Sequence, residues 1–157
     1  MKLHDYLEPE LIIVDCKESG TADILKEMVQ GLKKTNKISN EDLVFKKLLE
    51  REKLGSTSIG SHAAVPHTKL KKIKEPIISL GISKQGIQYH ENDKEPVHFI
   101  ILILSPENSP IIHLQILAAA AALIKKSKKL IKEILKVDTA AGLIEIVKKY
   151  ETLDDQE

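Results

Sequence analysis

The spacing of hydrophobic residues changes along this chain and predicts strands intermixed with helices. Residues 97–104 form a continuous apolar run between two prolines, which predicts a strand buried on both faces and covered there by helices. The β-branched run 11–16 and the apolar run 76–83 predict two more strands. We expect a turn with a short edge strand at 86–89, and short strands and turns at 56–66.

Five further segments place apolar residues three and four positions apart, which is the spacing of one helix face. Four of them follow residues that favour helix starts: Ser19, the Ser39–Asp42 pair, Ser109 before Pro110, and Asp138. The helix after Ser109 is apolar almost all round, which predicts that it is buried. The predicted helices are residues 21–34, a second that ends near Leu54-Gly55 with Leu43, Val44, Leu48 and Leu49 facing inward, 111–126, 128–136 and 139–150.

The order of these elements predicts an α/β sandwich with a mixed sheet of about five strands, parallel and antiparallel, and helices on both faces. The 157 residues suit a single domain over 1–157, which is long enough to bury a sizeable core. Aromatic residues make up only 3% of the chain, so we expect an aliphatic core.

Charge and cysteine content narrow the class of function. The formal net charge of +1 gives no bulk electrostatic case for a nucleic-acid partner, and the lysine-rich runs 69–74 and 125–129 are expected to be solvated faces. The single cysteine excludes an internal disulfide, and the amino-terminal region shows no signal peptide. The apolar run 11–14 is too short to span a bilayer. We therefore expect a cytoplasmic protein without direct membrane insertion.

The stretch richest in chemistry runs from Arg51 to His67, REKLGSTSIGSHAAVPH. Its small residues allow the backbone to approach a ligand closely, and Pro66 stiffens the chain just before the imidazole. A neutral histidine is a nucleophile towards phosphorus when its free nitrogen faces outward. An arginine at one end and an imidazole at the other suit an anion, and a transferable phosphoryl group above all.

Other candidates extend this site. Arg51 could grip a phosphoryl oxygen with a charge-assisted, bidentate contact. His113 is expected in the first turn of the helix after Ser109, where unpaired backbone N–H groups and the helix dipole attract anions and disfavour a protonated ring. Ser56, Thr57 and the neighbouring backbone amides are candidate further donors.

Each candidate also has an ordinary structural interpretation. His67 and His113 can be histidines of the core, and Arg51 can be an exposed residue at a helix end. Cys16 precedes a loop that is similar to a phosphocysteine loop, but a buried thiol is favoured. A zinc site built from His62, His67 and His113 is a further alternative, although the spacing fits no established ligand pattern.

The segment REKLGSTSIGSHAAVPH closely resembles the signature of the fructose/mannitol-type IIA domains of the bacterial phosphoenolpyruvate-dependent phosphotransferase system, including their nitrogen-regulatory branch. The strand PVHFIILIL, with HLQIL in the helix after it, resembles the second histidine region of that family. The likeness extends over essentially the whole chain. Two departures stand at His62 and Thr68, where the family commonly has glycine.

This resemblance implies a role for each candidate. His67 corresponds to the phosphorylated histidine, His113 to a second histidine that contacts the phosphoryl group, and Arg51 to the active-site arginine. The implied reaction takes phosphoryl from the phosphohistidine of HPr and passes it to a cysteine of a IIB domain, which serves a sugar-transporting membrane subunit. No metal or organic cofactor is implied. The nitrogen-regulatory branch implies the alternative of a protein that signals by phosphorylation-dependent binding.

Overall fold

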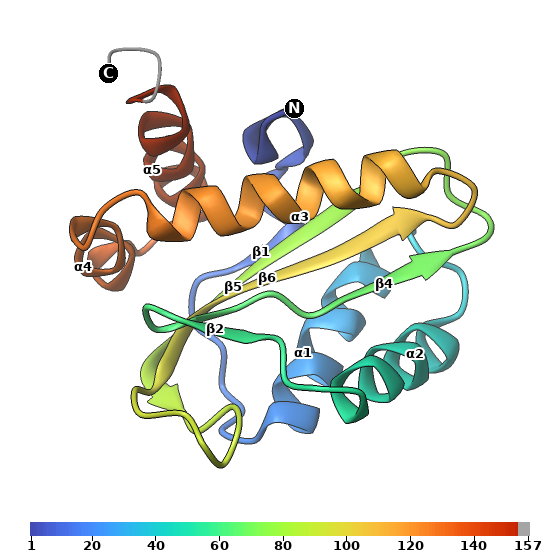
Figure 1. Ribbon diagram of the computed structural model, residues 1–157, viewed down its shortest axis with the longest axis horizontal. Coiled ribbons are helices and arrows are strands. Elements are labelled where there is room, and N and C mark those ends of the chain that lie inside the picture. Colours follow the sequence, from blue (N-terminus) through green and yellow to red (C-terminus); the bar gives the residue numbers. More distant parts are fainter. Residues whose placement is uncertain (154–157) are drawn as a thin grey trace.

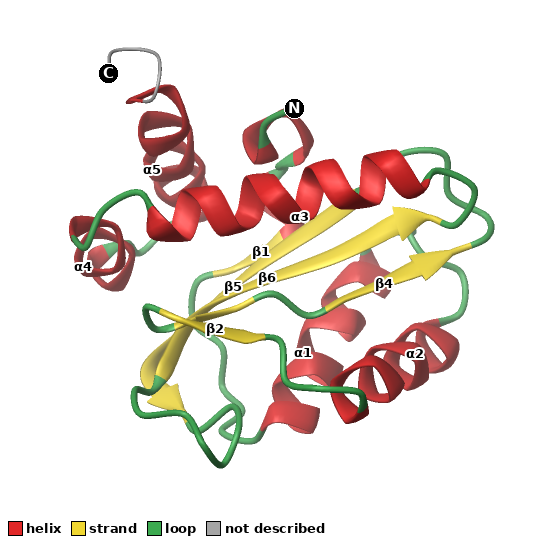
Figure 2. Cartoon of the chain, in the orientation of Figure 1, coloured by secondary structure: helices red, strands yellow, loops and turns green. Residues whose placement is uncertain are grey.

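The computed structural model describes residues 1–153 and has an α/β architecture, with a mixed sheet between two layers of helices (Figures 1 and 2). The helices are α1 (Thr21–Lys34), α2 (Glu41–Lys53), α3 (Pro110–Lys125), α4 (Lys129–Lys136) and α5 (Ala140–Thr152), with short 3-10 turns η1 (Leu3–Tyr6) and η2 (Pro9–Leu11). The strands are β1 (Ile12–Ile13), β2 (Ser58–Gly60), β3 (Ala63–Ala64), β4 (His67–Leu70), β5 (Ile77–Ile87) and β6 (Val97–Pro106).

Strand β6 is the centre of the sheet. The strand order is β1-β5-β6-β3-β2, and β4 also pairs with β6, beyond β3 along the same edge. Strands β5 and β6 are antiparallel, as are β2 and β3, whereas β1 runs parallel to β5, and both β3 and β4 run parallel to β6. The predicted mixed sheet is therefore confirmed.

Alternating residues of β6 face two separate hydrophobic clusters, which explains why this strand is apolar without a break. Ile100, Leu102 and Leu104 belong to the cluster beneath α1 and α2. Phe99, Ile101 and Ile103 belong to the cluster beneath α3, α4 and α5. Figure 1 shows α3 on one side of the sheet and α1 with α2 on the other, so the prediction of helices on both faces is confirmed.

The strand predictions were right in position but not always in length. Of residues 11–16, only Ile12 and Ile13 pair as a strand, since Leu11 belongs to η2 and the chain bends at Val14 and Asp15. Strand β5 continues to Ile87, so the separate edge strand expected at 86–89 is wrong. Strand β4 was not predicted, because its lysine-rich continuation suggested a solvated face.

Three of the predicted helix starts are displaced by one residue. Helix α1 is capped by Gly20 rather than Ser19, α2 by the Asn40 side chain, which accepts the Leu43 N–H at 3.1 Å, and α5 by Thr139 rather than Asp138. Ser109 occupies the N-cap of α3 as predicted, although its side chain makes no capping hydrogen bond.

The prediction that apolar side chains are buried is wrong at two leucines and one isoleucine. Leu43 is 48% exposed because it lies on the outer face of α2, whereas Val44 and Leu48 are buried. Helix α3 is not buried all round, since Ile111 and Leu114 near its start are 70% and 66% exposed. Within residues 1–153, no helix is long and apolar enough to cross a membrane.

Candidate functional site

His67 is the first residue of β4, and its ring is held by its own strand entry. Its Nδ1 lies 2.7 Å from the carbonyl oxygen of Val65, so Nδ1 carries the proton and donates it there. The Pro66 carbonyl accepts the N–H of Ile103 at 2.9 Å, which fixes this bend against β6. The arrangement leaves the lone pair of Nε2 free to act as an acceptor or a nucleophile.

Arg51 points at that free nitrogen from the last turn of α2. Its Nε–H donates to Nε2 of His67 at 3.3 Å, and its Nη1 donates to the Gly55 carbonyl at 2.9 Å. The second bond closes the turn that follows α2, so the guanidinium is held at two points. The structure thus brings the two ends of the Arg51–His67 stretch together.

His113 completes the group from the fourth position of α3. The centroids of its ring and the His67 ring are 5.5 Å apart, with the planes inclined by 54°. Its Nδ1 lies 2.8 Å from the hydroxyl oxygen of Ser105, a fully buried residue of β6. One nitrogen of the ring is therefore anchored, which sets the direction of the other.

The three side chains line a shallow hollow of about 330 Å³, and most of the charged side chains around it are positive. The remaining lining residues are Lys47, Thr68, Lys69 and Glu107. The Nζ of Lys47 donates to the Lys69 carbonyl at 2.5 Å, which ties α2 to β4 at the edge of the hollow. Three cationic side chains against one carboxylate favour an anionic ligand.

Burial is the main reason that both rings favour the neutral form. It lowers the pKa of His67, and the Arg51 charge lowers it further, against the opposing effects of the Val65 hydrogen bond and the Glu52 charge. Burial also lowers the pKa of His113, with His67 and Lys69 acting in the same direction. A neutral imidazole is the form that can attack an electrophile.

A pH titration followed by NMR of the imidazole nitrogens tests this electrostatic description. We expect the pKa of His67 and that of His113 to lie below the ordinary histidine value of about 6.5, so each ring should become protonated at a lower pH than an exposed histidine. Arg51→Gln should raise the pKa of His67, since it removes a nearby positive charge. A midpoint for His67 above 6.5 in the unmodified chain would contradict this account.

Ser56 and Thr57, the other predicted donors, do not line the hollow. Thr57 is buried, and its N–H and hydroxyl both bond to the carboxylate of Glu52. The Ser56 hydroxyl lies 3.0 Å from that of Ser58. Sequence reasoning missed Glu52, although it stands next to Arg51 in the quoted motif, and it missed Ser105, which ends an apolar strand without any local signal.

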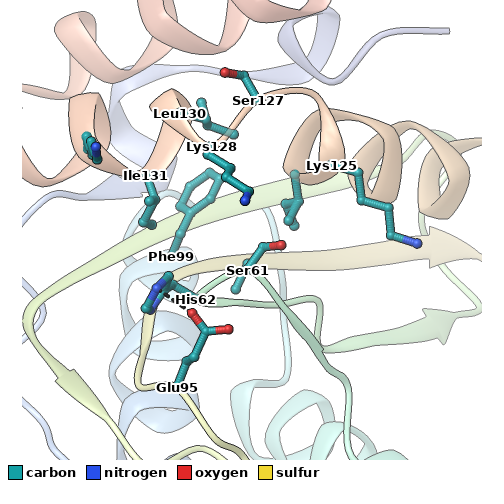
Figure 3. Close-up of a pocket in the computed structure, with 12 residues that line it drawn as sticks. Ser61, His62, Glu95, Phe99, Lys125, Ser127, Lys128, Leu130 and Ile131 are labelled. Carbon is teal, nitrogen blue, oxygen red and sulfur yellow. Dashed lines mark ion pairs between the residues drawn. The ribbon is translucent and has the colours of Figure 1, made fainter.

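His62 borders a different hollow, one of about 540 Å³ between the β2–β3 turn and the α3–α4 connection (Figure 3). Its Nε2 pairs with Glu95 at 2.7 Å and its Nδ1 bonds to the Pro96 carbonyl at 2.9 Å. The backbone φ of His62 is 64°, a left-handed conformation that glycine adopts without strain and other residues adopt rarely.

The alternatives raised by the sequence fit the structure poorly. Among residues 1–153, no three His, Cys, Asp or Glu side chains are grouped to hold a metal ion, so His62, His67 and His113 do not form a zinc site. Cys16 is buried, and burial raises the pKa of its thiol to about 12, so the thiolate needed for phosphocysteine chemistry is strongly disfavoured.

Comparisons with known proteins bear on the same site. Residues 5–150 match the family model described as "Phosphoenolpyruvate-dependent sugar phosphotransferase system, EIIA 2". Over 151 residues the chain is 28% identical to the phosphotransferase-system fructose-specific EIIABC component of Bacillus subtilis. The matched region covers 96% of this chain and 24% of that protein. The chain thus spans about a quarter of the length of that relative.

Solved structures share the fold. The nitrogen regulatory protein IIA-Ntr from Neisseria meningitidis superposes with a TM-score of 0.81 at 26% identity, over 92% of this chain and 98% of that one. Enzyme IIAMtl from Escherichia coli, solved in complex with phosphorylated enzyme IIBMtl, superposes with a TM-score of 0.76 over 91% of this chain and 97% of that one. At 18% identity, the second likeness concerns the fold alone.

Proposed function

The chain belongs to the EIIA 2 family of the phosphoenolpyruvate-dependent sugar phosphotransferase system. We propose that it is a phosphoryl carrier of that system and that it holds the phosphoryl group on Nε2 of His67. One observation supports Nε2, and not Nδ1, as the phosphorylated nitrogen. The Nδ1–H of His67 is committed to the Val65 carbonyl, so only Nε2 has a lone pair to offer. That nitrogen faces Arg51 at the hollow.

The proposed transfer needs only the residues of this site. The Nε2 lone pair forms a bond to phosphorus while the N–P bond of a donor phosphohistidine breaks and leaves its electron pair on the donor nitrogen. His67 keeps its Nδ1 proton, and the Val65 carbonyl stabilises the positive charge that the phosphorylated ring acquires. Once Nε2 is occupied, the Arg51 Nε–H turns from it to a phosphoryl oxygen, where a charge-assisted bond is stronger.

Family membership and the surface around the hollow support a proposal for the partners. We propose phosphorylated HPr as the donor, a IIB cysteine as the acceptor, and the cytoplasm as the compartment in which they meet. Exposed Ile111 and Leu114 flank His113, and Leu54, 84% exposed, follows Arg51 at the end of α2. Apolar side chains around a charged centre suit a protein surface that covers the hollow and excludes water during transfer.

His113 is proposed to stabilise the migrating group without carrying it. If the Ser105 hydroxyl donates to Nδ1, the neutral ring presents Nε2–H to a phosphoryl oxygen. We expect His113→Ala to be labelled slowly by phospho-HPr and to pass the group on poorly, with each rate reduced about 10²-fold or more. Rapid-quench measurement of both half-reactions checks this, and unchanged rates in both would remove His113 from the mechanism.

Incubation with phosphoenolpyruvate, enzyme I and HPr, followed by mass mapping, tests the proposed function directly. We expect one acid-labile phosphoryl group in the peptide that contains His67. A label on another residue would overturn the assignment, and no label at all would overturn the carrier role. Adding purified IIB proteins then shows whether the group moves on to a cysteine.

A regulatory role is the second candidate, and the likeness to IIA-Ntr favours it. A phosphoryl group adds about −1.5 to −2 charges, here beside an exposed apolar rim, which is enough to change what that rim binds. Phosphorylation on His67 without onward transfer to any IIB protein would support this candidate over sugar transport.

A further inference from the structure

A cluster of three hydrogen-bonded side chains adjoins the site without lining the hollow. The Oε1 of Glu52 accepts the backbone N–H of Thr57 at 3.0 Å, and its Oε2 accepts the hydroxyls of Thr57 at 2.5 Å and Tyr89 at 3.0 Å. The two hydroxyl oxygens are 3.1 Å apart, and Thr57 and Tyr89 are 4% and 6% exposed. Glu52 itself is half-buried, and polar groups that are paired with one another in this way hold one geometry.

One path of hydrogen bonds leads from this cluster to the imidazole. Glu52 holds the N–H of Thr57, and the carbonyl of Thr57 accepts the N–H of Val65 at 2.9 Å. The carbonyl of Val65 in turn accepts the Nδ1–H of His67 at 2.7 Å. The orientation and tautomer of His67 therefore depend on a strand segment that Glu52 holds in place.

A second path leads to the guanidinium. Glu52 binds Thr57 across the turn that follows α2, so residues 52–57 form a closed loop. Gly55 lies inside that loop, and its carbonyl accepts Nη1 of Arg51 at 2.9 Å. If the loop opened, this carbonyl would move and Arg51 would lose one of its two fixed points.

We propose that Glu52 is the positioning residue of this site, because a single carboxylate holds both the imidazole of His67 and the guanidinium of Arg51 in their relative orientation. The proposal rests on the phosphoryl-carrier function argued above. Glu52 does not line the hollow, and both of its oxygens are occupied, so it acts through its neighbours and not on the phosphoryl group. Small displacements of reacting groups reduce rates strongly, by up to about 10²-fold for 1 Å.

The test compares Glu52→Ala and Glu52→Gln with Glu50→Ala, which alters an exposed glutamate two residues earlier on the same helix. We expect Glu52→Ala to lower the rate of phosphoryl uptake at saturating phospho-HPr roughly 10- to 100-fold, with little change in the half-saturating concentration. Glu52→Gln keeps one acceptor oxygen and should act in the same direction with a smaller effect. Glu50→Ala should match the unmodified chain.

A spectroscopic measurement separates positioning from a merely structural role. Imidazole ¹⁵N shifts should report one His67 tautomer, protonated at Nδ1, in the unmodified chain and a mixture in folded Glu52 variants. The double variant Glu52→Ala/Thr57→Val should lose no more than Glu52→Ala alone, because both residues act through one bond network.

Two results would overturn the proposal: folded Glu52 variants with unchanged uptake and tautomer, or losses in the double variant that add independently. Failure of the proposed function is distinguishable, since it would show as no uptake by the unmodified chain. The tautomer comparison would then still decide whether Glu52 positions His67.

Discussion

A chain carrying His67→Gln is expected to take up no phosphoryl group from phospho-HPr and to deliver none to a IIB domain. The glutamine side chain is similar to that of histidine in size and polarity. The lone pair of its amide nitrogen, however, is delocalised into the carbonyl and cannot attack phosphorus. His113 should not substitute for His67, because a Ser105 hydroxyl that donates to its Nδ1 leaves the proton on Nε2, which then has no lone pair to offer. Intact mass after incubation with phosphoenolpyruvate, enzyme I and HPr measures the result.

His62→Gln is the matched control for that experiment. His62 is also a partly exposed histidine near the end of the motif, but it pairs with Glu95 and lines the other hollow. It should be labelled at the normal rate. Labelling that survives in His67→Gln, with a folded chain by amide NMR, would refute the central assignment.

The second large effect is expected for Arg51→Gln, which should reduce the rate of phosphoryl uptake by about 10²–10³-fold. The guanidinium is held by His67 Nε2 and the Gly55 carbonyl before any ligand arrives, so its donors are already arranged for the charge that spreads over the phosphoryl oxygens. Glutamine has no charge and cannot offer the planar pair of N–H donors with which a guanidinium binds two phosphoryl oxygens. Rapid-quench kinetics under saturating phospho-HPr measure the loss.

Arg51→Lys and Lys53→Gln sharpen the interpretation of that result. Lysine keeps the charge but not the planar pair of donors, so Arg51→Lys should fall between the unmodified chain and Arg51→Gln. Lys53 is exposed on the same turn of α2 and does not line the hollow, so its loss should change little. Equal rates for Arg51→Gln and the unmodified chain would show that the guanidinium has no part in transfer.

The sequence anticipated which side chains lie together at the hollow better than it anticipated the details of the scaffold. Pro66 before His67, and Ser109-Pro110 before His113, are local signals that place each imidazole at the start of an element, and the structure brings both rings together. Their meeting depends on the parallel pairing of β4 with β6, which is a long-range contact. Periodicity reports only neighbours along the chain, so it gave no strand at β4.

Hydroxyl groups were the weakest part of the prediction. Thr57 was expected to donate to an anion because hydroxyl-rich turns often do, yet its hydroxyl is buried against Glu52 and Tyr89. Tyr89 is more than thirty positions away along the chain and brings its hydroxyl there through the fold. A sequence gives the donors that are present, but the competition between acceptors for those donors is decided only in three dimensions.

The shallow hollow beside His67 has a consequence for the order in which partner proteins would bind. Under the proposed carrier function, a donor protein that covers this opening would leave no room for the acceptor protein, so the two would have to bind in turn. Between these two encounters a phosphoryl group on His67 would face the solvent and would be open to hydrolysis. The overall rate of phosphoryl transfer would then depend on how quickly each complex dissociates. A mutation that strengthened the binding of either partner would slow the whole transfer.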